Sequence, residues 1–242
     1  FNMHITYLQH SGFVITLPDA ILVFDYYRDP AHALTHILSR HTDTPVIFFV
    51  SHSHPDHYNP AIFNMAQNHQ RIYILSNDIL AQNVPTTLAV QGMSRGDIVD
   101  NLPAGISVRA YGSTDKGISF LVTTVAGRKI FHAGDLNDWH WQDESSQREV
   151  LKADNAFSTI LNRIAEDNPH LHVAMFPVDS RLGSDYARGA RLFLNKVKVN
   201  YFFPMHFSSD WKEACDFTSY AGSQSASCHC LHSPGQSFDI PD

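Results

Sequence analysis

The sequence predicts an α/β fold built as a single domain over residues 1–242. Short strands dominate the first half, and in the second half strands alternate with helical segments, an order typical of α/β proteins. A length of 242 residues with 43% hydrophobic content is enough to bury one sizeable core. No repeat of fixed period and no linker rich in Pro, Gly or Ser marks a boundary within the chain.

Apolar segments separated by turn residues predict the first strands. The segments HITYLQ, GFVITL and AILVFDYY predict an antiparallel meander. A helix is predicted over residues 31–40, where Leu34, Ile37 and Leu38 recur at helical spacing. The β-branched and aromatic run VIFFV, residues 46–50, predicts the next strand.

A second helix is predicted over residues 59–68, because Asn59 suits its cap and Pro60 its first helical position. The loop before it therefore lies between the end of a strand and the start of a helix, where α/β folds build sites. A short helix is predicted over residues 77–82. Strands are predicted near RIYIL, TTLAV, DIVDN, ISVRAYG, ISFLVTTV and KIFHAG.

The second half is predicted to place helices on strands. Apolar residues at helical spacing predict a long amphipathic helix over residues 144–166. The order then continues with the strand HVAMFPV, a helix over residues 184–197, the strand NYFFPMHF, a helix over residues 211–221 and a last strand near QSFDI.

Charge and composition argue against a general polyanion binder. Seventeen Lys and Arg against 24 Asp and Glu give a net charge of −7, and no stretch gathers basic residues. No apolar run approaches the roughly 20 residues of a membrane span, and the start of the sequence lacks the features of a signal peptide. The expected partner is a small-molecule substrate rather than a nucleic acid or a membrane, and the oligomeric state stays open.

The three cysteines, Cys215, Cys228 and Cys230, lie close together near the end of the sequence. An odd count argues against a disulfide framework and favours a reduced, cytoplasmic setting. The segment CHCLH resembles half of a zinc site, but no second cysteine pair stands at finger spacing. A cluster of small residues before the last strand is the simpler interpretation.

Histidine is over-represented, with 16 residues, and four potential metal ligands crowd the segment SHSHPDHYNP directly after VIFFV. Alternate residues of an extended loop share a face, so His52 and His54 are expected to point to one side. Asp56 and His57 then turn toward a second position. Such a loop suits two cations about 3.5–4 Å apart. If this loop only capped the next helix, its imidazoles and carboxylate would converge in a pocket without partners, which costs free energy.

Two more candidate ligands follow later strands: Asp135 in FHAGDLNDWHW and His206 in FFPMHF. Each has an ordinary alternative role, since an aspartate after a glycine is common in turns and a lone histidine often belongs to the core.

The run H-x-H-x-D-H after an apolar strand, the later GD and the histidine of FFPMHF together resemble the metallo-β-lactamase superfamily. The segments YLQHSGFVI, IFHAGD and FPVDSRLG are similar to the branch that includes L-ascorbate-6-phosphate lactonase and uncharacterised metal-dependent hydrolases. The match extends from His10 to His206. It implies a four-layer αββα sandwich and a hydrolase that uses a metal-activated water on a small ester, lactone or phosphoester. Zinc, as one or two ions, is the implied cofactor, with manganese as the alternative.

The resemblance also implies roles for individual residues. The first metal would be bound by His52 and His54, the second by Asp56, His57 and His206, and Asp135 would bridge the two. The family usually supplies a third histidine to the first metal, but the corresponding segment RAYGSTDKGISF has none. His132, His140 or Asp115 are the candidates to replace it. If nothing does, the chain is expected to be a metal-binding sensor or interaction module without turnover.

Other residues near these motifs have two interpretations. Asp56 and His10 are the candidate catalytic groups: Asp56 would orient the water, and His10 would contact the substrate or transfer a proton, unless it is an ordinary turn histidine. Trp139 and Trp141 form a pocket wall or pack against a helix. Asp179 and Arg181 orient a ligand or bind an anionic substrate group, or form an internal ion pair.

Overall fold

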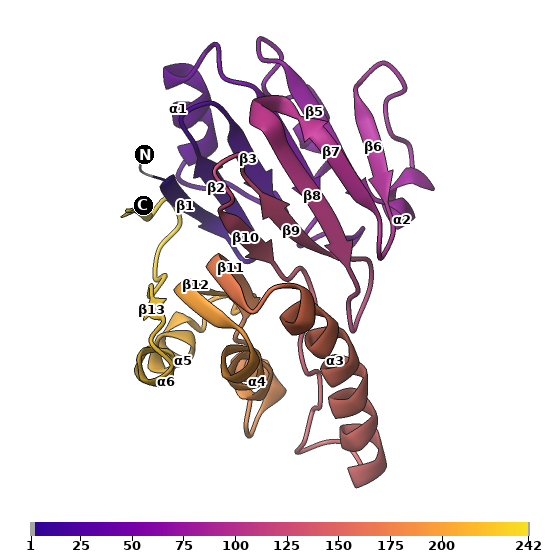
Figure 1. The fold of residues 1–242 in the computed structure, drawn as a ribbon, viewed down its shortest axis with the longest axis vertical. Helices are drawn as coiled ribbons and strands as arrows, with labels where there is room; N and C mark the ends of the chain where they lie inside the picture. Colours follow the sequence, from indigo (N-terminus) through magenta and orange to yellow (C-terminus); the bar gives the residue numbers. More distant parts are fainter. Residues whose placement is uncertain (1–2, 242) are drawn as a thin grey trace.

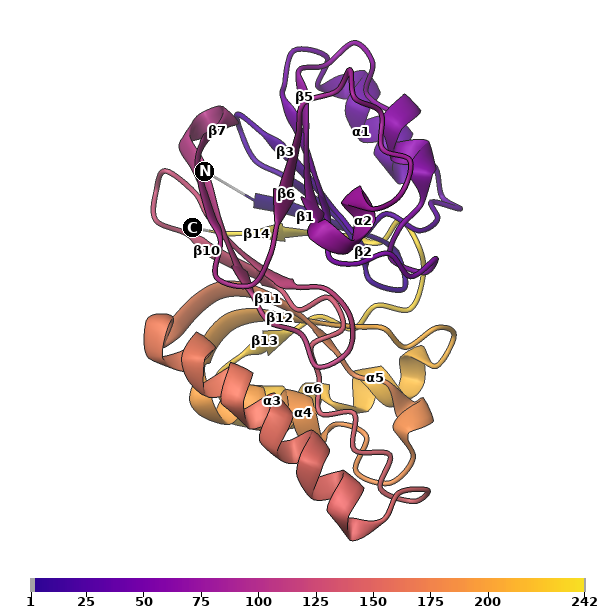
Figure 2. The same cartoon turned by 90° about the vertical axis from the view of Figure 1, so that its right-hand side faces the viewer.

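The computed structural model describes residues 3–241 and has the predicted four-layer αββα architecture. Two seven-stranded sheets face each other, and the helices cover their outer faces (Figures 1 and 2). Helices α1 (Ala33–Arg40) and α2 (Asn77–Leu80) lie on the first sheet. The second sheet carries α3 (Gln147–Asp167), α4 (Arg188–Lys196), α5 (Trp211–Asp216) and α6 (Thr218–Ser223).

The first sheet has the order β14-β1-β2-β3-β4-β5-β6. The neighbours β1, β2 and β3 are antiparallel, which confirms the predicted meander, and β3 to β6 are parallel. The last strand pairs with the first, so both ends of the described chain lie at one edge (Figure 1). The strands are β1 (Met3–Gln9), β2 (Gly12–Thr16), β3 (Ile21–Phe24), β4 (Val46–Val50), β5 (Arg71–Ser76), β6 (Val90–Met93) and β14 (Ser237–Ile240).

The second sheet has the order β13-β12-β11-β10-β9-β8-β7. Strands β7 to β10 are antiparallel to their neighbours, whereas β10 to β13 are parallel. The strands are β7 (Ile98–Leu102), β8 (Ile106–Tyr111), β9 (Ser119–Thr123), β10 (Lys129–His132), β11 (His170–Pro177), β12 (Lys198–Met205) and β13 (Ser227–Cys228). Three 3-10 turns complete the described part: η1 (Pro60–Asn64), η2 (Pro103–Gly105) and η3 (Ser180–Leu182).

Strand β4 is apolar at every position, with no alternation of apolar and polar residues, because both of its faces are buried. Side chains alternate between the faces of a strand, and both faces of this sheet are covered. Phe49 faces the other sheet, where its ring lies 5.4 Å from that of Phe120. Phe48 faces the helical layer and stacks on Tyr73 at 4.9 Å. Burial on both sides fixes β4 firmly, and with it the start of the histidine-rich loop.

Several predicted helices differ in extent from the observed ones. The helix predicted over residues 59–68 is only the 3-10 turn η1, which Asn59 caps by accepting a hydrogen bond from Ala61 N. It ends at Met65, whose backbone is extended. The helix predicted over residues 211–221 is divided into α5 and α6. The long helix α3 is confirmed and begins with a capping box between Ser146 and Glu149.

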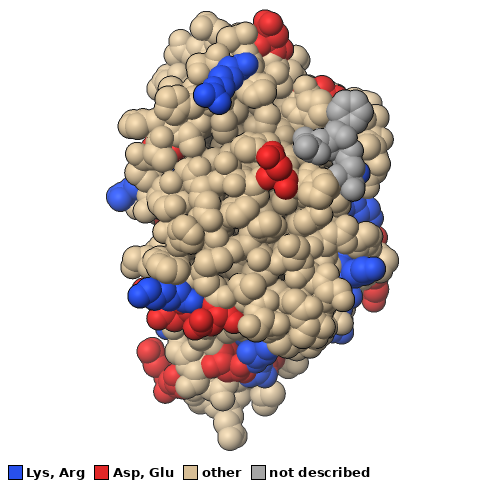
Figure 3. Space-filling model, turned by 90° about the vertical axis from the view of Figure 1, so that its left-hand side faces the viewer, with Lys and Arg blue, Asp and Glu red and all other residues tan. Residues whose placement is uncertain are grey.

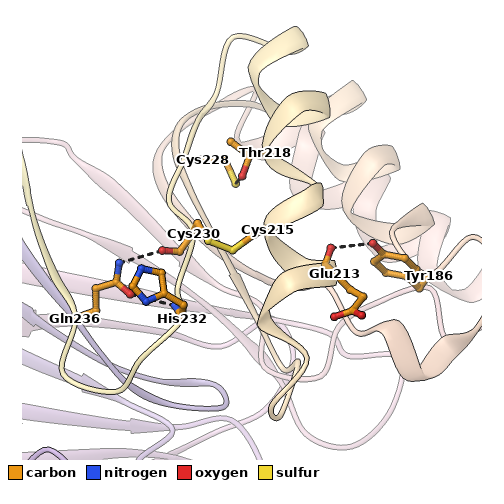
Figure 4. The surroundings of a disulfide bond; sticks show 8 residues. All are labelled: Tyr186, Glu213, Cys215, Thr218, Cys228, Cys230, His232 and Gln236. Atoms are coloured by element: carbon orange, nitrogen blue, oxygen red, sulfur yellow. Dashed lines mark hydrogen bonds between the residues drawn. A yellow bond between two sulfur atoms is a disulfide. The ribbon is translucent and has the colours of Figure 1, made fainter.

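The expectation of unpaired cysteines is wrong, because Cys215 and Cys230 form a disulfide (Figure 4). Their Cα atoms lie 5.0 Å apart because α5 packs beside the segment that follows β13. The odd count misled because the third cysteine, Cys228, stays free and accepts a long hydrogen bond from Thr218 Oγ1. The disulfide also removes Cys230 from any zinc site of the CHCLH segment.

The surface shown in Figure 3 carries few charged residues, and the two signs are interspersed on it. No basic patch gathers on this face. Among the described helices, none combines the length and apolar character that crossing a bilayer requires.

Candidate metal centre

The predicted ligands meet where strands from both sheets end. His52, His54, Asp56 and His57 lie in the loop after β4 of the first sheet. Asp135 follows β10, and His206 follows β12 of the second sheet. The facing sheets therefore bring together side chains that are far apart in the sequence.

The carboxylate of Asp135 is at the middle of the cluster. Its Oδ2 lies 3.0 Å from His52 Nε2, and its Oδ1 lies 2.9 Å from His57 Nε2 and 3.1 Å from His206 Nε2. His54 Nδ1 lies farther away, 3.8 Å from Oδ2. Each carboxylate oxygen thus faces a different set of imidazoles, which is the arrangement a bridging carboxylate needs.

The donor atoms form three groups, and within each group they lie within 4.8 Å of one another: Asp25 groups with His52 and His57, and the predicted ligands fall in the two other groups. One group contains His52, His54 and Asp135, as the sequence predicts. The other contains Asp56, His57 and His206 together with His10, which the sequence did not predict as a ligand. His10 Nε2 lies 3.1 Å from Asp56 Oδ2.

Asp25, at the end of β3, is a site residue that sequence reasoning missed. It is fully buried and accepts hydrogen bonds from Ser51 N, Ser51 Oγ and His57 Nδ1 at 2.6–2.8 Å. Since Ser51 Oγ donates to Asp25, it accepts from His52 Nδ1 at 2.9 Å. Asp25 therefore orients two candidate ligands, one directly and one through Ser51. The available signal was an aspartate closing an otherwise apolar strand, in AILVFD.

Asp179, at the start of η3, holds the third imidazole in the same way. Its Oδ2 accepts a hydrogen bond from His206 Nδ1 at 2.9 Å. The same carboxylate accepts hydrogen bonds from Nε and Nη2 of Arg181. Of the three interpretations of this pair, the structure shows positioning of a candidate ligand and internal ion pairing, and binding of an anionic substrate group stays a prediction.

These contacts leave the donor atoms of the centre free for a cation. With Nδ1 of His57 and His206 bound to carboxylates, each ring presents its Nε2 atom to the interior. The buried atoms His10 Nε2, His57 Nε2 and Asp135 Oδ1 lie 2.9–3.1 Å from other donor atoms of the centre, but they make no well-aligned hydrogen bond among the described residues. Buried polar atoms rarely stay unsatisfied, and imidazole with carboxylate is a donor set that suits zinc, manganese or iron. The residues present thus fit a metal ion.

The pKa shifts agree with a site built for positive charge. Burial would raise the pKa of Asp135, but the surrounding imidazoles of His206, His52 and His57 hold it far below its ordinary value. Burial would lower the pKa of His57, but the carboxylates of Asp135 and Asp25 outweigh burial and raise it to about 10. Without a metal, protons supply the positive charge here, so metal binding is expected to release protons.

Two of the three candidates for the missing ligand are excluded by their own hydrogen bonds. His132 Nε2 donates to Ser11 O, and its Nδ1 accepts from Gly134 N. Both nitrogens of His140 also bind backbone atoms, Asp185 O and Gln142 N. Asp115 remains: it is half exposed, and its Oδ2 lies 3.7 Å from His54 Nδ1.

The backbone is unusual around the centre. His10, Asp25, Trp141 and His206 all have positive φ angles, between 41° and 63°. Such conformations cost free energy for residues other than glycine and are concentrated at functional sites. Gly134 precedes Asp135 at φ 55°, and a Cβ there would lie 2.7 Å from Ser51 Cβ. Only glycine allows the Asp135 loop to approach the histidine-rich loop so closely.

Two cavities open beside the centre. One of about 290 Å³ is lined by Thr114, Asp115, Asp135, Trp139, Trp141, Arg181 and His206. The other, about 530 Å³, reaches the centre at His10 and is otherwise lined by residues such as Tyr7, Tyr27 and Trp211. Trp139 and Trp141, in the loop after Asp135, both line the smaller cavity. Of the two roles that the sequence left open for these tryptophans, they therefore have the first, that of a pocket wall.

The chain is similar to several known proteins. The chain is 26% identical, over 98% of its length and all of the relative's, to a protein of Opitutus terrae named UPF0173 metal-dependent hydrolase. A metallo hydrolase of Ignicoccus hospitalis has a similar fold, with a TM-score of 0.67 over the whole of both chains and 17% identity. CmlA, a diiron β-hydroxylase of Streptomyces venezuelae, matches 98% of this chain and 54% of its own, with a TM-score of 0.66 and 10% identity.

The family assignment comes from a sequence model. Residues 4–206 match the model of the "Beta-lactamase superfamily domain", and this range includes every predicted ligand from His52 to His206. The predicted αββα sandwich is also the observed fold. The chain therefore belongs to the beta-lactamase superfamily, in its metallo-β-lactamase fold.

Proposed function

We propose that this chain is a metal-dependent hydrolase that uses a metal-activated water on a small ester, lactone or phosphoester. One observation carries the proposal: Asp135 lies within 3.1 Å of Nε2 atoms of three imidazoles. Each of these rings is held at Nδ1 by a buried partner, and such outer partners orient metal ligands. The class of enzyme agrees with the name of the Opitutus terrae relative.

In this proposal His52 and His54 bind the first metal, and Asp56, His57 and His206 bind the second, with Asp135 between them. The donor set favours zinc, with manganese as the alternative, and the similarity to the diiron protein CmlA adds iron to the candidates. One or two ions are consistent with the two donor groups.

A bound metal would supply a nucleophilic water near neutral pH and would polarise the scissile carbonyl or phosphoryl group. The chain's own residues then position and shield the reactants. Asp56 is 41% exposed beside the donors and is proposed to orient the attacking water. His10 is proposed to contact the substrate or transfer a proton, because its Nε2 lies beside Asp56 and its ring borders the larger cavity.

The test combines metal analysis with turnover. We expect one to two equivalents of zinc or manganese on protein purified without chelators, and hydrolysis of members of an ester, lactone and phosphoester panel. Chelation should remove activity, and returning the metal should restore it. Protein that binds no metal under these conditions would contradict the proposal.

A sensor or interaction module without turnover is the second candidate. It is favoured by the segment at residues 109–120, which has no histidine for the first metal. This candidate predicts one metal equivalent and no hydrolysis across the whole panel.

Asp115 is expected to complete the first metal site. Replacing it with Ala removes the carboxylate that lies 3.7 Å from His54 Nδ1. The metal content should fall toward one equivalent, and activity should fall roughly ten- to a hundredfold. Metal analysis and kinetics of Asp115→Ala can be compared with Asp19→Ala, an exposed aspartate in the turn between β2 and β3. Unchanged metal content in Asp115→Ala would exclude Asp115 as a ligand.

The cytoplasmic location stays a prediction. The disulfide between Cys215 and Cys230 argues against it, since such bonds persist mainly in oxidising compartments.

A further inference from the structure

We propose that the smaller cavity binds a carboxylate carried by the substrate, so that the preferred substrate is an acidic ester or lactone. The anchor is Arg181, in the wall of this cavity beside Asp135 and His206. This inference rests on the proposed hydrolase function, because it names the substrate class of the same site.

Arg181 is held in place by Asp179, but only part of its hydrogen-bonding capacity is engaged. Its Nε and Nη2 atoms donate to Asp179, whose side chain is only 1% exposed. Its Nη1 atom makes no hydrogen bond with any residue in the described part of the chain. The Arg181 side chain is nevertheless 49% exposed, and the cavity gives it a place for a ligand. An internal ion pair would not need this exposure. A guanidinium held on one side is well placed to donate to an anion on the other.

The remaining lining residues suit a small apolar or aromatic group that carries the carboxylate. Trp139 is fixed by a hydrogen bond from its Nε1 to Asp135 O at 2.7 Å, and its ring meets His206 edge-on at 5.3 Å. The Trp141 ring lies 6.5 Å from it, nearly parallel. The two indoles give the cavity apolar surface near the guanidinium and His206. The volume of about 290 Å³ restricts the cavity to a small group.

A carboxylate fits the charges better than a phosphate dianion. The carboxylates of Asp179 and Asp210 already offset the charge of Arg181 and raise its pKa, so they oppose a second negative charge beside it. The nearby cation Lys116 is already engaged, since its Nζ donates to Ser53 Oγ and lies 3.6 Å from Asp78. The hydrogen bonds of Arg181 within the described residues leave its Nη1 atom to donate to a ligand, which is enough for a carboxylate oxygen.

Three acetate esters of phenols test this inference: phenyl acetate, 4-acetoxybenzoate and 4-acetoxyphenyl phosphate. In Arg181→Gln we expect KM for 4-acetoxybenzoate to rise about ten- to a hundredfold, the value of a hydrogen bond to a charged group. KM for phenyl acetate should rise far less. The KM of each variant is divided by the KM of the wild type for the same ester, so that the different reactivities of the three leaving groups do not affect the comparison.

Two further variants separate anion binding from a positioning role. Arg191→Gln also removes an arginine paired with an aspartate, Asp185, but outside the cavity, and should leave the ratio between the esters unchanged. Arg181→Lys keeps the charge and should retain part of the preference. If Arg181→Gln lowers kcat equally for all three esters, Arg181 only supports Asp179 and His206, and the inference is wrong. A wild-type preference for the phosphate ester would overturn the assignment to a carboxylate.

Calorimetric binding of 4-hydroxybenzoate and 4-hydroxybenzamide to the purified holoprotein tests the cavity without turnover. The benzoate should bind at least tenfold more tightly, and Arg181→Gln should abolish the difference. If no member of the ester, lactone and phosphoester panel is hydrolysed but the benzoate preference depends on Arg181, the hydrolase proposal fails and the anion site stands. If esters are hydrolysed but the two ligands bind equally, the anion site is refuted and the hydrolase proposal stands.

Discussion

Replacing Asp135 with Ala is expected to abolish hydrolysis and to remove metal from both positions. Asp135 is the only described carboxylate that lies within 3.1 Å of His52, His57 and His206 together. Replacing the outer partner of a metal ligand typically costs ten- to a hundredfold in metal affinity or activity. Loss of the carboxylate that lies beside imidazoles of both proposed metal positions should therefore cost more than about a hundredfold.

The measurements are the metal content and kcat/KM of Asp135→Ala. Asp100→Ala, an exposed aspartate of β7, is a matched control and should behave as wild type. A circular dichroism spectrum like that of the wild type would show that the variant still folds. Turnover retained by a folded Asp135→Ala would refute the bridging role.

Replacing Asp25 with Ala is expected to have the largest effect on stability. The variant loses the acceptor of three hydrogen bonds and leaves Ser51 and His57 with unsatisfied donors in a fully buried place. Breaking a buried charged pair costs about 3–5 kcal/mol in the free energy of unfolding. For a chain of this size, that corresponds to a fall in Tm of roughly 6–20 °C.

Thermal unfolding and metal analysis check this expectation. Asp25→Asn keeps one carbonyl oxygen as an acceptor and should lose less stability than Asp25→Ala. Both variants should bind metal at least tenfold more weakly, since His52 and His57 lose their orientation. A melting temperature and metal affinity equal to those of the wild type would contradict a positioning role for Asp25.

The sequence was sufficient to predict which side chains meet at the candidate centre, because four of them are concentrated in one short loop. His52 and His57 follow β4, whose five residues are all apolar and buried. A strand of this kind belongs in the interior of a sheet that is covered on both faces. That strand determines where the loop begins, and the alternation of side chains decides how its residues are shared between two positions. Asp135 and His206 could be added because each closes a predicted strand.

The supporting residues could not be predicted in the same way. Asp25 and Asp179 act through contacts with residues 32 and 27 positions away in the chain. No local pattern encodes such contacts, since they depend on how the strands are ordered in each sheet. The same reason explains the disulfide: the pairing of Cys215 with Cys230 depends on how α5 packs, and the number of cysteines carries no information about that.

The pairing of β14 with β1 has a consequence for biosynthesis. Met3 pairs with Ile240, so the ribosome makes β1 long before it makes the strand that covers its edge. During that delay β1 exposes unpaired backbone groups to neighbouring nascent chains. A contact of such long sequence separation also slows folding, which lengthens the time for which this edge is exposed.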